Sequence, residues 1–162
     1  MVSKLRKHPL ICLLLSAFCL LVGRLRLKRL YIKSMIKMDD DSAFQIFRYI
    51  SRENIDINQN HTVFIVKFKF SHLSFKANKL TSIIPMLLIT GFPGFQKKIY
   101  CVNHLNGYWQ GMYQWANLEC LEEYKKSLVF RVMNKRAIPE SISTEHFVDS
   151  DLDPFVKDRL IK

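Results

Sequence analysis

Aromatic side chains and one histidine cluster in a short part of the sequence, where their types and spacing could support oxidation chemistry. The stretch "NGYWQGMYQWAN" alternates, so that Trp109, Tyr113 and Trp115 point to one side of an expected strand. On the strand expected before it, Tyr100 and His104 share a face. A cofactor-free oxygenase needs an apolar cavity for an aromatic substrate, a base active near neutral pH, and phenol or indole donors that fix the substrate's oxygens. We take His104 as the candidate catalytic base and the other four as candidate substrate-binding residues.

The same pattern has a plainer interpretation. Alternating aromatic residues on a hairpin commonly only pack a sheet, and a histidine beside a turn is commonly solvated. The other histidines lie in the basic leader or beside expected strands: His8, His61, His72 and His146. No pair of His, Cys, Asp or Glu has metal-ligand spacing, and there is no glycine-rich phosphate loop or nucleophile elbow. We therefore expect no metal and no cofactor.

The elements that must position these residues follow from the hydrophobic period. A period of two predicts strands over residues 61–70, 96–104, 108–115 and 140–148. Helical spacing predicts helices over 75–91, kinked or restarted at Pro85, and over 118–136, begun by Asn117. The order strand, helix, strand, strand, helix, strand predicts an α+β fold of two split βαβ halves. Such halves form a ferredoxin-like, four-stranded antiparallel sheet with both helices on one face.

The turn between the two aromatic strands sets which residues face each other. Asn106-Gly107 is a strong signal for a two-residue hairpin turn. Such a turn would place His104 opposite Trp109 and Tyr100 opposite Tyr113. The result would be one aromatic face with a single imidazole.

Two further segments flank this domain of residues 61–148. In residues 38–60 we expect an extra helix and a linker, because Asp40, Asp41 or Ser42 could cap a helix whose apolar residues recur at helical spacing. Residues 149–162 are acidic and contain Pro154, and we expect a loosely attached C-terminal tail.

The basic residues lie mainly outside the expected domain. The net charge is +11, yet residues 1–37 carry nine Lys or Arg and no acid, whereas residues 38–162 carry sixteen basic against fourteen acidic residues. A nucleic-acid-binding domain would need its basic residues on the folded surface among aromatic stacking partners. We therefore expect no nucleic-acid partner.

The basic, apolar leader of residues 1–37 predicts a membrane anchor. Residues 9–23 have no charged side chain and, as a helix, would extend roughly 22 Å, short of the ~30 Å hydrocarbon core unless flanking arginines snorkel. Heavier positive charge after this segment would leave the domain in the cytosol. Organellar targeting and a buried core helix are the alternatives, and the sequence does not decide whether the leader is cleaved.

Four motifs follow each other in residues 61–148: "GFPGF", "GYWQGMYQW", "NLECLEEYKKS" and "KRAIPESISTEHF". In these motifs and their order the body resembles the monooxygenases of the dimeric α/β-barrel superfamily, whose best known members are the antibiotic-biosynthesis monooxygenases. In that superfamily two ferredoxin-like subunits join through their open sheet faces, so the resemblance implies a homodimer. Its haem-degrading branch uses an asparagine on the first strand and a histidine on the second helix. Here "TVFIVKFKF" has no Asn and residues 118–136 have no His, so we do not expect this chain to belong to that branch.

These observations lead to two hypotheses. The first is a membrane-anchored, cofactor-independent monooxygenase acting on a small lipophilic aromatic substrate such as a quinol. The second is a non-catalytic dimeric module that holds a small apolar ligand. They differ in whether the face with His104 encloses a cavity where chemistry takes place.

Overall fold

One antiparallel sheet of seven strands organises the protein. The computed structural model describes residues 7–53, 60–70 and 74–161. The sheet order is β1-β3-β5-β6-β4-β7, and β2 also pairs with β3. The strands are β1 (Leu25–Lys28), β2 (Met35–Lys37), β3 (Ala43–Arg52), β4 (Thr62–Phe68), β5 (Phe95–Val102), β6 (Trp109–Trp115) and β7 (Ser143–Val148).

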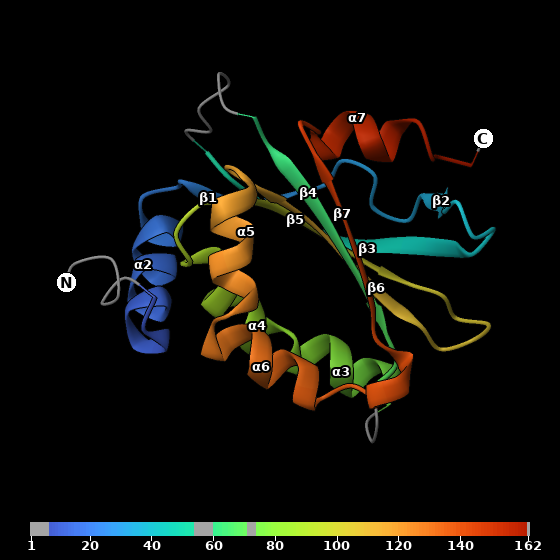
Figure 1. Ribbon diagram of the computed structural model, residues 1–162, viewed down its shortest axis with the longest axis horizontal. Coiled ribbons are helices and arrows are strands. Elements are labelled where there is room, and N and C mark those ends of the chain that lie inside the picture. Colours follow the sequence, from blue (N-terminus) through green and yellow to red (C-terminus); the bar gives the residue numbers. More distant parts are fainter. Residues whose placement is uncertain (1–6, 54–59, 71–73, 162) are drawn as a thin grey trace.

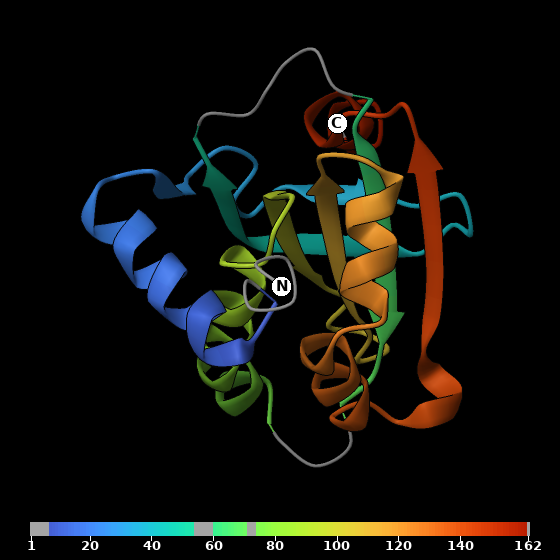
Figure 2. The same ribbon diagram turned by 60° about the vertical axis from the view of Figure 1, so that its left-hand side comes forward.

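Helices cover both faces of this sheet. The helices from α2 to α6 lie on one side, and α7 lies on the other (Figures 1 and 2). The helices are α2 (Pro9–Leu21), α3 (Phe75–Thr81), α4 (Ile83–Thr90), α5 (Leu118–Lys125), α6 (Leu128–Lys135) and α7 (Leu152–Lys157), and a short 3₁₀ turn, η1, spans Pro139–Ser141. Residues of α2, α4, α5 and α6 form the larger apolar core together with the aromatic sheet face.

The central part of the sheet has the strand order of a ferredoxin-like fold. Within it β5, β6, β4 and β7 are neighbours, and α3–α4 and α5–α6 form the two crossovers. Each predicted helix is divided in two. The first break lies at Ser82, which ends α3, and Pro85 lies in the first turn of α4. The second break lies at Ser127, whose hydroxyl accepts a hydrogen bond from the amide of Phe130 and so begins α6. The predicted antiparallel sheet with helices on one face is confirmed for this part.

The predicted extra helix in residues 38–60 is wrong, because this segment forms the strand β3. A β-bulge between Ile46 and Arg48 inserts Phe47 into the register with β5. The bulge changes which residues face each side: Phe44 and Ile46 before it and Tyr49 after it pack on one face, while Phe47 packs on the other. Because the bulge moves the residues after it to the other face, apolar residues in this strand recur every three positions, and this spacing resembles that of a helix. The linker residues 54–59 lie outside the described residues.

The leader forms a helix that packs on the domain. Cys12, Ser16 and Cys19 are buried on one face of α2, and the Ser16 hydroxyl lies 2.9 Å from that of Thr90 on α4. Gly91 permits this approach, because a Cβ at that position would lie 1.8 Å from the Cys12 carbonyl oxygen. Within residues 7–53, 60–70 and 74–161, no helix combines the length and the apolar character needed to cross a bilayer. Residues 1–6 of the leader lie outside the described residues.

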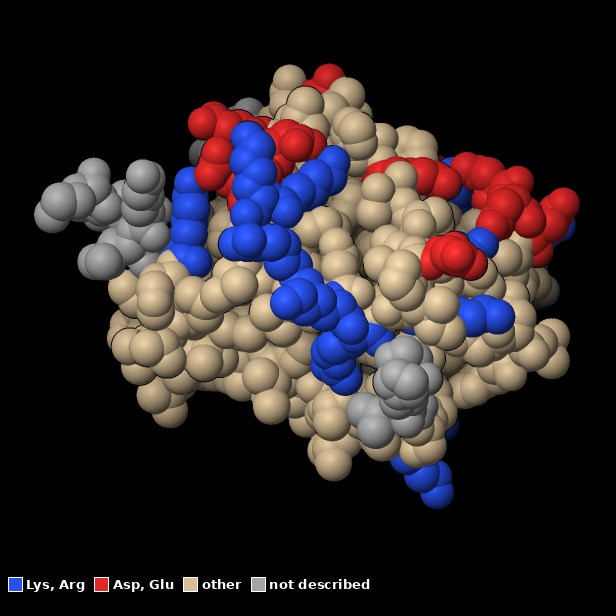
Figure 3. Space-filling model, turned by 60° about the horizontal axis from the view of Figure 1, so that its bottom comes forward, with Lys and Arg blue, Asp and Glu red and all other residues tan. Residues whose placement is uncertain are grey.

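The outer face of α2 is apolar and exposed. Leu10, Leu14, Phe18 and Leu21 form a stripe along it, with exposed fractions from 56% to 86%. Leu80 and Ile84 add exposed apolar surface on α3 and α4. In Figure 3 a broad area without charged side chains adjoins a row of Lys and Arg.

The C-terminal segment is not a loose tail, because its helix α7 packs on the second sheet face. Leu152 and Val156 are fully buried there. Asp153 accepts a hydrogen bond from the Tyr49 hydroxyl at 2.6 Å and forms an ion pair with Lys97 at 2.7 Å. The helix α7 therefore covers this second sheet face within one chain. The homodimer stays a prediction.

Candidate functional site

The hairpin of β5 and β6 carries most of the predicted site residues. Its loop is wider than predicted: the main chains pair at Asn103 and Tyr108, so four residues intervene instead of two. The Asn103 side chain accepts the amides of Leu105 and Asn106, and Gly107 adopts a φ of +75°. These bonds stabilise the longer loop and shift the predicted register by two residues.

A shift of two residues preserves which face each side chain occupies. The observed pairs on the aromatic face are Tyr100 with Gly111 and Lys98 with Tyr113. The predicted aromatic face is therefore confirmed, whereas the predicted pairing of Tyr100 with Tyr113 and of His104 with Trp109 is wrong.

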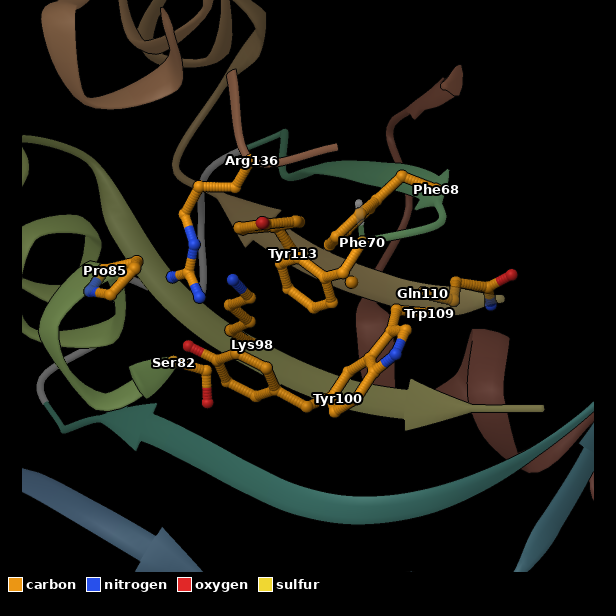
Figure 4. Close-up of a pocket in the computed structure, with 11 residues that line it drawn as sticks. Phe68, Phe70, Ser82, Pro85, Lys98, Tyr100, Trp109, Gln110, Tyr113 and Arg136 are labelled. Carbon is orange, nitrogen blue, oxygen red and sulfur yellow. The ribbon is translucent and has the colours of Figure 1, made fainter. Parts of the chain in front are cut away.

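A small pocket, called the inner pocket here, lies between this face and the helices (Figure 4). Its volume is about 30 Å³, enough for one or two water molecules. Lys98, Tyr100, Trp109, Gly111 and Tyr113 form its floor. Its other walls come from β4 and the residues after it, from α4, from β6 and from the segment after α6: Phe68, Phe70, Ser82, Pro85, Gln110 and Arg136.

Lys98 is the most unusual residue of the inner pocket. Its side chain is only 2% exposed, and its Nζ lies 4.1 Å and 4.2 Å from the ring centroids of Tyr100 and Tyr113. No described residue forms a hydrogen bond or ion pair with this amine. Burial lowers the pKa of Lys98 well below its usual value, and the nearby positive charge of Arg48 lowers it further. The amine is thus a candidate proton acceptor in an apolar setting.

Two tyrosines supply hydroxyl groups beside this amine. Burial raises the pKa of Tyr100 and of Tyr113 well above the usual value, so both stay protonated. The Tyr100 hydroxyl is buried and has no hydrogen-bond partner among the described residues. Gly111 leaves room for the Tyr113 ring, since a Cβ there would lie 2.9 Å from it. A ligand oxygen in the pocket would satisfy the unpaired hydroxyl of Tyr100.

Two arginines add positive charge on the helix side. Arg136 donates to the Thr81 hydroxyl at 2.6 Å and points into the inner pocket toward Lys98 (Figure 4). Arg48 donates to the Ser82 hydroxyl at 2.8 Å and lies 5.2 Å above the Tyr100 ring. No Asp or Glu lines the inner pocket within the described part of the chain. The charged side chains that line the inner pocket in the described part of the chain, Lys98 and Arg136, are therefore both basic.

A second, larger depression adjoins the inner pocket and is called the outer hollow. Its volume is about 190 Å³, and Phe70 and Trp109 line both spaces. His104 and Phe75 form part of its wall, with ring centroids 4.9 Å apart. The His104 side chain is exposed, and its Nε2 lies 3.3 Å from Oε1 of Gln45.

The predicted site residues thus separate into three places. Tyr100, Trp109 and Tyr113 line the inner pocket, and His104 lies at the outer hollow. Trp115 lines neither space, because it is fully buried in the core, where its ring stacks on Tyr124 at 4.6 Å.

Sequence reasoning missed the two cations of the inner pocket. Lys98 lies two residues before Tyr100 on β5 and therefore on the same sheet face. This spacing is the sequence signal that could have placed Lys98 in the site. Arg136 is the last residue of the predicted helix 118–136, and no sequence signal indicated that it turns inward after α6 ends at Lys135.

In the described part of the chain, no group of three or more His, Cys, Asp or Glu has a metal-binding arrangement.

Comparisons with known proteins find similarity in structure only. Neither a model of a known protein family nor a curated protein sequence matches the chain. A protein described as a "putative monooxygenase from Lactobacillus acidophilus NCFM" aligns with a TM-score of 0.47 and 13% identity over 67% of this chain. An "anthrone oxidase-like protein" aligns with a TM-score of 0.41 and 14% identity over 65% of this chain. The aligned part spans 52% of each of these two proteins, about half their length.

Proposed function

We propose that the protein is a cofactor-independent monooxygenase of small lipophilic aromatic substrates of the quinol type. The observation that carries this proposal is the buried amine of Lys98, without a hydrogen-bond partner among the described residues, in an aromatic pocket without carboxylates. The substrate ring occupies the outer hollow against Phe75 and Trp109, and its hydroxyl enters the inner pocket. The sequence-derived resemblance to monooxygenases agrees with this assignment.

The chemistry begins with proton transfer. Neutral Lys98 accepts the proton of the quinol hydroxyl, and the Tyr100 hydroxyl and the Arg136 guanidinium donate to the resulting phenolate oxygen. The electron-rich ring then reacts with O₂. One oxygen atom replaces a ring hydrogen as a hydroxyl group and the other leaves as water. The substrate supplies all four electrons, because the quinol becomes a quinone and one ring carbon is hydroxylated.

Oxygen consumption by the full chain with a panel of naphthoquinols and benzoquinols tests this function. Lys98→Met keeps the length of the side chain and removes the base, and should lower turnover about a hundredfold or more. Lys97→Met is the matched control, because Lys97 lies on the opposite sheet face with Asp153 and should leave turnover unchanged. Equal turnover in wild type and Lys98→Met would refute the role of Lys98.

The candidate base from the sequence, His104, is tested in the same assay. It lines the outer hollow, where it is exposed to solvent, and lies outside the inner pocket. His104→Ala is therefore expected to reduce turnover less than Lys98→Met. The reverse order would restore His104 as the base.

A non-catalytic module that binds a small apolar ligand is the second candidate function. The position of His104 favours it, because this exposed side chain lies outside the inner pocket that holds Tyr100 and Tyr113. Binding of a naphthoquinol under anaerobic conditions, with no oxygen consumption in air, would support this alternative.

We also propose that the apolar stripe of α2 lies flat on a membrane surface. Leu14, Phe18 and Leu21 would enter the interface, and the exposed Arg24 after the helix and Arg29 after β1 would contact anionic headgroups. Cosedimentation with phosphatidylserine vesicles tests this, with phosphatidylcholine vesicles as the comparison. The double variant Leu14→Gln and Phe18→Gln should remain in the supernatant, and unchanged sedimentation would contradict the proposal.

A further inference from the structure

The charges around the inner pocket indicate what kind of ligand it takes. The groups that face Lys98 are Arg48 on β3, Tyr100 on β5, Tyr113 on β6 and Arg136 after α6. Two of these are cations, two are neutral phenols, and none is an acid. Lys98 is buried and forms no hydrogen bond with a described residue, and the buried Tyr100 hydroxyl has no partner either, so an anion that accepts from both groups removes the cost of burying them.

The sizes of the two spaces set a second condition on the ligand. The inner pocket, at about 30 Å³, accommodates a group of the size of a carboxylate or a phenolate oxygen, whereas the outer hollow, at about 190 Å³, is larger. An apolar cavity of about 150 Å³ holds benzene, so the outer hollow is large enough for an aromatic ring. Trp109 and Phe70 border both spaces and would flank the bond between the ring and its anionic group.

We propose that this pocket binds planar aromatic acids as anions and takes up one proton at Lys98 when they bind. The carboxylate lies between the Lys98 ammonium and the Arg136 guanidinium, and the Tyr100 hydroxyl donates to it. The inference rests on the pocket assigned in the proposed function and names a wider ligand class for it. Quinols belong to this class, and their own hydroxyl group supplies the proton that Lys98 takes up.

The proton uptake follows from the state of the empty pocket. The pKa of Lys98 is lowered by burial and by Arg48, so the amine tends to be neutral before the anion arrives. A carboxylate beside it favours the charged form, and the proton comes from solution. Above the Lys98 pKa of the free protein, the affinity for a carboxylate should fall about tenfold for each pH unit. A quinol transfers its own hydroxyl proton, so its binding takes up none.

Isothermal titration calorimetry of the full chain with benzoate and with naphthoate tests the proposal, with benzamide as the neutral control. Titrations in phosphate and in Tris, repeated between about pH 6 and pH 9, separate proton uptake from binding heat. We expect the acids to bind at least tenfold more tightly than benzamide, with uptake approaching one proton at the upper end of this range. Equal binding of acid and amide, no binding of either, or no proton uptake anywhere in the range would overturn the proposal.

Two variants assign the roles. Lys98→Met should lose both the proton uptake and at least tenfold in benzoate affinity, whereas Arg136→Gln should lose affinity and retain the uptake. Lys97→Met, on the other face of the same strand, should behave as wild type. Uptake that persists in Lys98→Met would assign the proton elsewhere and refute the proposal. Since benzoate is not a quinol, benzoate binding without quinol oxidation would keep this inference and reject the proposed oxygenation.

Discussion

Replacing the buried Lys98 should stabilise the protein, and the gain should depend on pH. The unfolded chain has a lysine with a pKa of about 10.4. In the folded state, burial and then Arg48 lower the pKa of Lys98 well below this value. Between the two pKa values the unfolded chain holds a proton that the folded chain lacks. The free energy of unfolding therefore rises with pH in this window and falls as the pH is lowered toward the folded pKa.

The size of the effect follows from one proton. Its contribution changes the free energy of unfolding by about 1.4 kcal/mol per pH unit within the window. Lys98→Met removes this contribution and places an apolar side chain of similar length between the rings of Tyr100 and Tyr113. The variant should therefore be more stable than wild type near pH 7, and its advantage should shrink toward pH 9.

Urea unfolding at several pH values, followed by tryptophan fluorescence, measures the two free energies. Tyr100 and Tyr113 stay protonated from pH 6 to pH 9, because burial raises their pKa values, so the difference between the two proteins reports on Lys98. Lys97→Met, which removes the ion pair with Asp153, shows the effect of losing a lysine from the opposite face. A difference between wild type and Lys98→Met that stays constant from pH 6 to pH 9 would refute the buried-amine argument.

Three further predictions concern the rest of the fold. Gly91→Ala should weaken the docking of α2, because the new Cβ would meet the Cys12 carbonyl oxygen; faster labelling of Cys12 by a thiol reagent and a lower Tm are expected. Leu152→Ala should destabilise the protein by about 2–5 kcal/mol in urea unfolding, since this fully buried side chain fixes α7 on the sheet; a change below about 1 kcal/mol would mean that α7 contributes little. Light scattering tests the predicted homodimer: a mass of about twice 19.2 kDa is expected, and 19.2 kDa would show that α7 closes the sheet face in a monomer.

Much of the fold follows from sequence periodicity, because the strands β4, β5 and β6 bury side chains on both faces in a regular alternation. Phe64 and Val66 face the helices, whereas Val63 and Ile65 face α7, as a period of two requires. The prediction failed at β3, where one bulge residue changes the phase and imitates a helix. A local pattern cannot show that a segment pairs with a strand some fifty residues further along the chain.

Sequence periodicity also predicted part of the candidate site. The aromatic face was found because a register error of two residues leaves the parity of Tyr100, Trp109 and Tyr113 unchanged. Lys98 was missed because a lysine on a strand normally indicates a solvated position, and its burial depends on helices that come from elsewhere in the chain. The extra length of the hairpin loop depends on the Asn103 side chain, which a count of turn residues does not include.

The order of the strands in the sheet has a consequence for how the chain folds. Only the β5–β6 hairpin and the β2–β3 pair join strands that follow each other in sequence, whereas β3 must find β5, and β4 must find both β6 and β7. Pairings between distant segments fold slowly, so we expect folding in milliseconds to seconds. The hairpin that carries Lys98 can form early, with its amine still hydrated. The water around Lys98 is then removed only when α4 and α6 dock, which makes that docking the step most sensitive to the charge on this lysine.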